Sequence, residues 1–80
     1  MKLQFNKLTN KCYPSDGATV FLLDNHGCAH SGLIEYLCGN VSLLPTNCSH
    51  KTLLGTMIKG KFVAGRDFEL AIFADVQNER

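Results

Sequence analysis

The sequence lacks any apolar segment that approaches the ~18 residues needed to cross a bilayer. It also lacks a secretory signal, because residues 1–7 include polar side chains where such a signal needs an unbroken apolar stretch. These two absences predict a soluble protein of the cytoplasm without a membrane partner.

An excess of charge of either sign is also missing, since eight Lys and Arg residues face seven Asp and Glu residues, for a net charge of +1. This balance argues against nonspecific binding to phosphate backbones, so nucleic acid is not expected as the sole target. The seven glycines are scattered singly, and neither standard phosphate-binding glycine loop is present. The net charge alone does not indicate which class of molecule the protein binds.

Tryptophan is absent, but hydrophobic residues make up 45% of the chain, which is typical of a globular protein and not of a disordered segment. Eighty residues indicate a single domain, 1–80, near the lower limit of what a hydrophobic core stabilises unaided. No linker or low-complexity segment divides it.

Four cysteines are present, at positions 12, 28, 38 and 48. Because thiols stay reduced in the cytoplasm, we interpret them as metal ligands, small buried hydrophobic residues or reactive thiols, and not as disulfides.

Two segments of the chain, twenty residues apart, share the same order of residue types. The first contains Cys28-Ala29-His30, Leu33-Ile34 and Leu37-Cys38, and the second contains Cys48-Ser49-His50, Leu53-Leu54 and Met57-Ile58. Each follows an apolar run, 20–23 or 41–44, that is typical of a strand. The near-repeat therefore predicts a duplicated unit of strand, loop and helix.

The remaining patterns complete the expected order of elements. Residues 2–8 alternate as a half-buried strand, 9–17 contain a Pro and Gly turn signal, and 18–23 form an apolar run expected to be a strand covered on both faces.

Two short helices are expected next. The first begins at Ser31 and ends at Gly39-Asn40, and the second begins at Ser49 and ends at Gly60. Gly55 weakens the second helix, and a strand hairpin over 52–63 is the alternative.

The alternation over 68–76 predicts a strand that pairs with 61–63 through a turn at 64–67. Together these elements predict an α/β (or α+β) fold, a small single-layer mixed sheet with two short helices and an antiparallel C-terminal hairpin.

In such a fold, loops that follow neighbouring parallel strands meet at one edge of the sheet. This would bring together four side chains that suit zinc, which prefers four nitrogen and sulfur ligands in a tetrahedron. The predicted ligands are Cys28, His30, Cys48 and His50. A zinc-stabilised adaptor is therefore one functional hypothesis, although Cys-x-His differs from the common ligand spacings.

A second hypothesis uses a single thiol. Cys28-Ala29-His30-Ser31, after the apolar run 20–23, is similar in layout to monothiol glutaredoxin-like and thioredoxin-like sites, in which a helix N-terminus activates the cysteine. The resemblance implies thiol-redox activity of Cys28, with Ser31 in place of a second cysteine.

We expect neither of these as the main function, because no convergent set of acid, base and nucleophile is evident. The sequence instead predicts a small non-enzymatic protein that regulates or inhibits a protein target by binding it. The polar loops around Pro14 and over 25–31 are the expected contact regions, since loops often carry recognition.

Overall fold

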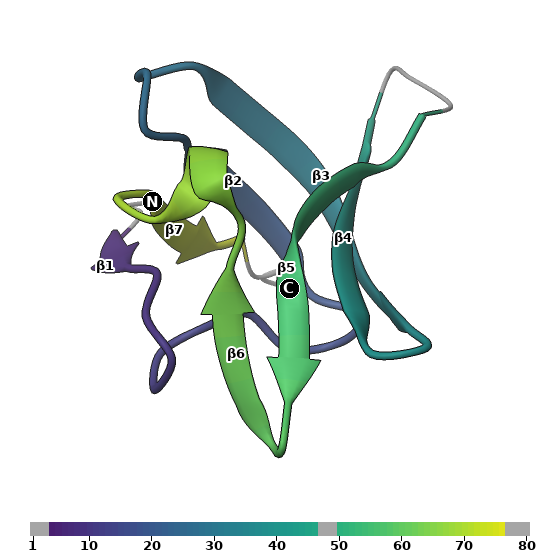
Figure 1. Ribbon diagram of the computed structural model, residues 1–80. Helices are drawn as coiled ribbons and strands as arrows, with labels where there is room; N and C mark the ends of the chain where they lie inside the picture. The colour runs from purple at the N-terminus through teal and green to yellow at the C-terminus, as the bar shows by residue number, and fades with distance from the viewer. Residues whose placement is uncertain (1–3, 47–49, 77–80) are drawn as a thin grey trace.

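The computed structural model describes residues 4–46 and 50–76, and the described chain forms one antiparallel sheet with no α-helix. The strands follow the spatial order β1-β7-β2-β3-β4-β5-β6, and the sheet curls into a half-barrel (Figure 1). The elements are β1 (Asn6–Lys7), β2 (Thr19–Leu23), β3 (Ala29–Leu37), β4 (Asn40–Pro45), β5 (Thr52–Ile58), β6 (Lys61–Ala64), the 3-10 turn η1 (Arg66–Phe68) and β7 (Ile72–Asp75). The predicted α/β fold with a mixed sheet and two helices is therefore wrong.

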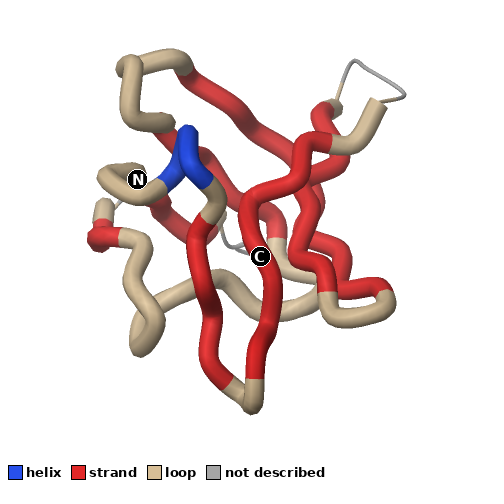
Figure 2. The backbone as a smooth tube through the Cα atoms, viewed as in Figure 1, coloured by secondary structure: helices blue, strands red, loops and turns tan. Residues whose placement is uncertain are grey.

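The first predicted helix is the long strand β3 (Figure 2). Its apolar residues lie on both faces of the strand, because Ile34 is buried while Leu33 and Leu37 are exposed. The signal taken for a helix end belongs to a two-residue hairpin turn, in which Cys38 and Gly39 have φ of 53° and 83°. Positive φ at both central residues is the requirement of a type I′ turn, which connects β3 directly to β4.

The second predicted helix is also wrong, and the alternative hairpin over 52–63 is confirmed. β5 and β6 pair around Lys59 and Gly60, which have φ of 52° and 79°. A β-bulge in the pairing of β4 with β5 turns two consecutive residues, Leu54 and Gly55, toward the buried side.

The predicted C-terminal hairpin does not form either. β6 pairs with β5, whereas β7 lies on the other side of the sheet between β1 and β2. Within the stretch expected to be one long strand, Phe68 belongs to η1 and Leu70 is 79% exposed. Only the part over β7 is a strand, and burial does not alternate along it, because Phe73 and Ala74 are both buried.

The core occupies the inner side of the curled sheet, so the sheet packs against itself instead of against helices. Nearly all strands contribute to one cluster, with Tyr13, Tyr36 and Met57 packed at its margin. The buried hydrophobic residues are Leu8, Val20, Leu22, Ile34, Val41, Leu43, Leu54, Phe62, Phe68, Ala71, Phe73 and Ala74. Burial of such side chains stabilises the fold by about 1.5–3 kcal/mol for each of the larger ones.

The predicted loop over 9–17 is confirmed and covers one side of the core. The Tyr13 ring stacks on Phe62 with their centroids 5.5 Å apart. The Tyr36 hydroxyl donates to the Pro14 carbonyl, and the Tyr36 amide donates to Asp16 Oδ1. Burial, together with Tyr13 and Asp16, raises the pKa of Tyr36.

Among the described residues, no helix has the length and apolarity that a membrane crossing requires.

Gly55, beside the β-bulge, is a position at which a side chain would oppose the curl. A Cβ there would overlap the Val63 carbonyl oxygen and lie 2.9 Å from the Phe62 ring. We expect Gly55→Ala to lower the free energy of unfolding by about 1–3 kcal/mol, because the backbone of β6 must shift to admit it. Urea denaturation measures this loss.

Gly65→Ala is the matched control, since its added Cβ would meet Leu54 O at 3.1 Å and its φ of −70° suits alanine. A loss at Gly55 no greater than that at Gly65 would contradict this account of the bend.

Candidate functional site

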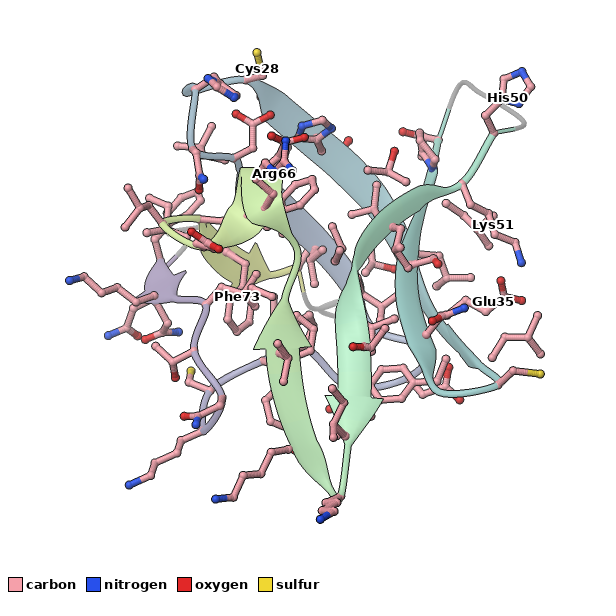
Figure 3. The ribbon with its side chains drawn as sticks, in the orientation of Figure 1. Cys28, Glu35, His50, Lys51, Arg66 and Phe73 are labelled. Carbon is pink, nitrogen blue, oxygen red and sulfur yellow. The ribbon has the colours of Figure 1, made fainter. Side chains whose placement is uncertain are left out.

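The predicted zinc ligands occupy different parts of one end of the sheet. Cys28 precedes β3, His30 lies within β3, and His50 precedes β5, while Cys48 lies outside the described residues. Figure 3 shows Cys28 and His50 apart from each other, each pointing outward. Both residues are exposed.

The structure brings two of the four predicted ligands to one depression. His30 and His50 both line a hollow of about 440 Å³, formed where β4 ends and β3 and β5 begin. Within residues 4–46 and 50–76, no group of three or more His, Cys, Asp or Glu side chains is arranged to hold a metal ion. The four ligands were expected to converge because loops after parallel strands meet at one edge of a sheet. That reason does not apply, because β3, β4 and β5 are antiparallel. Zinc binding stays a prediction.

The thiol-redox hypothesis loses its structural basis as well. Cys28 is followed by a strand, so it does not lie at the N-terminus of a helix, where exposed amide groups would stabilise a thiolate. The similarity to glutaredoxin-like sites is therefore confined to the sequence.

Asp24 organises the loop that carries Cys28. Asp24 Oδ1 accepts hydrogen bonds of 2.9 Å from the backbone amides of His26 and Cys28, and Asp24 Oδ2 lies 3.0 Å from His30 Nε2. The His30 ring also contacts the edge of Phe68, with centroids 5.8 Å apart. The imidazole nitrogen that faces the carboxylate is thus engaged in holding the loop against the core.

The same contacts explain the acidity of Asp24. The hydrogen bond from His30, with those from the Cys28 and His26 amides, lowers the pKa of Asp24 from 3.8 to about 2 against the opposing effect of burial. All of these groups favour the ionised carboxylate, so their effect is to stabilise the native loop at neutral pH.

Asn25 ties this loop to the segment that follows β6. Its side chain donates to the Arg66 carbonyl at 2.8 Å and accepts from the Leu70 amide at 2.6 Å. The Asn25 amide donates to the Asp67 carbonyl. The sequence carried no signal for this clamp beyond a polar loop residue, because its partners are more than forty positions away.

The outer face of β2 to β6 carries apolar side chains that the core does not use. Cross-strand pairing aligns Leu33 with Leu44. Leu33 is 43% exposed, and Leu53 on β5 is 53% exposed. Phe21 on β2 is 42% exposed, so β2 is covered on one face only, contrary to the expectation of two. We call Phe21, Leu33, Leu44 and Leu53 the outer apolar surface.

One ion pair lies on the same face. Lys51 Nζ is 2.7 Å from Glu35 Oε1, and the pair spans β4 (Figure 3). Glu35 and Leu53 are both register partners of Ser42. Because the two charges neutralise each other, they leave the surface suited to an apolar partner and contribute at most about 1 kcal/mol to stability.

Comparison of the chain with protein-family models, with curated proteins and with solved structures found no match.

The hydrogen-bonded carboxylate of Asp24 makes a testable contribution to acid stability. Because its pKa is lower in the folded protein than the reference value, its contribution is complete above about 3.8 and is lost as the pH falls to about 2. We expect Asp24→Asn to be less stable at neutral pH and to show a flatter decline in the free energy of unfolding over that acidic range.

Asp67→Asn provides the control, since it removes a carboxylate that is 64% exposed and 3.7 Å from His26. Equal acid profiles of Asp24→Asn and Asp67→Asn would rule out this role of Asp24.

Proposed function

We propose that this is a small non-enzymatic binding protein that regulates or inhibits a protein target through its outer apolar surface. The observation that carries the proposal is the exposure of Phe21, Leu33 and Leu53, between 42% and 53%, on one face of a continuous sheet. Contiguous apolar side chains on the surface of a small protein mark sites of protein association.

The arrangement of this surface supports a protein partner. Leucine side chains on three adjacent strands present a broad and rigid face, because β4 is paired with a neighbour on both sides. A rigid face loses little conformational entropy on binding. The neighbouring Lys51 and Glu35 supply a polar margin, which is typical of protein interfaces.

The loops that the sequence favoured for contact take part in internal hydrogen bonds. The Pro14 carbonyl accepts from Tyr36, and Asn25 clamps the segment after β6. We therefore place the contact on the strands and not on these loops.

We also propose that the protein acts in the cytoplasm. The described cysteines Cys12, Cys28 and Cys38 are exposed free thiols, the form that a reducing compartment maintains.

The double variant Leu33→Thr/Leu53→Thr tests the outer apolar surface. Threonine retains β propensity, so we expect the stability to change by less than about 0.5 kcal/mol for each site. Binding to the target isolated with the unaltered protein from its host should weaken by at least about tenfold, because apolar contact is lost at the centre of the interface. Calorimetric titration with the purified target measures the change.

Leu70→Thr is the matched control, because Leu70 is a still more exposed leucine, at 79%, away from this surface. Unchanged affinity of the double variant, or an equal loss with Leu70→Thr, would refute the proposed contact surface.

A further inference from the structure

β6 is one of the two edge strands of the sheet, and its second edge faces away from β5. The two-residue turn at Lys59 and Gly60 makes Ile58 and Lys61 a hydrogen-bonded pair, so the next such pair along the hairpin is Thr56 with Val63. The bond from the Gly65 amide to the Leu54 carbonyl continues the same alternation.

The backbone groups of the intervening residues, Phe62 and Ala64, therefore point to the open edge. Within the described chain, their two amides donate no hydrogen bond to another element, and their two carbonyls accept none. Each of the two residues thus offers one amide donor and one carbonyl acceptor at the open edge. The two residues are two positions apart, which matches the spacing at which an added antiparallel strand forms its hydrogen bonds.

A groove runs beside this edge. It has a volume of about 440 Å³ and lies between β6 and the chain that follows β1. Phe62, Val63 and Ala64 form one side, and Leu8 with Thr9 and Asn10 form the other. Its floor is continuous with the core, because Phe62 and Leu8 are both buried.

The charge of the groove indicates which side chains of a partner would complement it. Among the described residues that line it, Glu69 alone carries a formal charge. An apolar side chain directed at the core and a basic side chain near Glu69 would therefore match the groove.

We propose that the β6 edge binds an extended segment of a protein partner, which adds one strand to the sheet and carries apolar residues at alternate positions with a basic residue opposite Glu69. The backbone of Phe62 and Ala64 supplies the hydrogen bonds, and the groove receives the alternate side chains. This mode of recognition, in which main-chain bonds give affinity, tolerates variation in sequence. It goes beyond the proposed function and uses a different surface.

The geometry favours a single segment over a second copy of the chain. The side of the groove formed by Leu8, Thr9 and Asn10 faces β6 across the added strand. If the β6 of a second copy were the added strand, the β5 of that copy would have to occupy the space of Leu8, Thr9 and Asn10. A single extended segment has no such neighbouring strand and avoids this clash.

The test uses a synthetic peptide that alternates valine and threonine between terminal lysines, capped at both ends. In the free protein, we expect the amides of Phe62 and Ala64 to exchange with solvent deuterium much faster than those of Lys61 and Val63. On titration with the peptide up to about 1 mM, the Phe62 and Ala64 amide resonances should shift and their exchange should slow by at least about tenfold.

Two N-methylated forms of the peptide provide controls on the unaltered protein. One has methyl groups on the valine nitrogens and the other on the threonine nitrogens, so each blocks one edge of the added strand. One form should lose binding by at least about tenfold, while the other binds like the parent peptide. The Ala64→Pro variant, which lacks one outward amide, should also lose binding. The Leu33→Thr/Leu53→Thr variant should keep it.

Several results would overturn the inference. These are slow exchange of Phe62 and Ala64 in the free protein, no peptide-dependent shifts at the β6 edge, equal binding of both N-methylated peptides, or concentration-dependent dimerisation that protects the same amides.

Discussion

The structure depends on the curl that lets one sheet bury its own inner face. A flat sheet of this size has no second layer to cover its apolar side, and the described chain supplies no α-helix for that purpose. The bend at Leu54 and Gly55 brings Phe62 over the interior, where Tyr13 stacks on it. Gly55 is required at this point because the Val63 carbonyl and the Phe62 ring occupy the space of a side chain.

The polar contacts at one end of the half-barrel follow from this closure. Curling brings the loop after β2 next to the segment after β6, and Asn25 joins them through the Arg66 carbonyl and the Leu70 amide. Asp24 then fixes the loop and the His30 ring. The Asp24 carboxylate thus holds its own loop together, while Asn25 joins that loop to the segment after β6.

The surfaces left by the curl are those that we assign to binding. Concentrating large side chains such as Phe62 on the inner side leaves Leu33 and Leu53 outside, because β-strands alternate their side chains between faces. A half-barrel also retains open edges, and within the described residues the β6 edge has unpaired backbone groups beside a groove. The outer apolar surface and the β6 edge are therefore consequences of one architecture, although each can be tested without the other.

Local sequence was sufficient to predict the strand at β2, the loop before it and the left-handed backbone at Gly39 and Gly60, although these glycines were assigned to helix ends. Each of these follows from local chemistry, such as the preference of Gly39 and Gly60 for a left-handed backbone. The near-repeat did not form the predicted duplicated unit of strand, loop and helix, because its copies became β3 and β5. Pairs such as Leu33-Ile34 and Leu53-Leu54 satisfy the helical period over two turns and also fill the two faces of a strand, so local pattern does not separate these structures.

Long-range strand pairing selects the strands over the helices. β4 pairs with both β3 and β5 and so satisfies backbone groups of each, whereas a helix of two turns is only marginally stable without packing. The position of Asn25 was decided in the same way, because its partners Arg66 and Leu70 lie on another connection of the curled sheet. Strand pairing joins residues that are distant in sequence, and this is why composition and spacing located the turns but not the sheet that they connect.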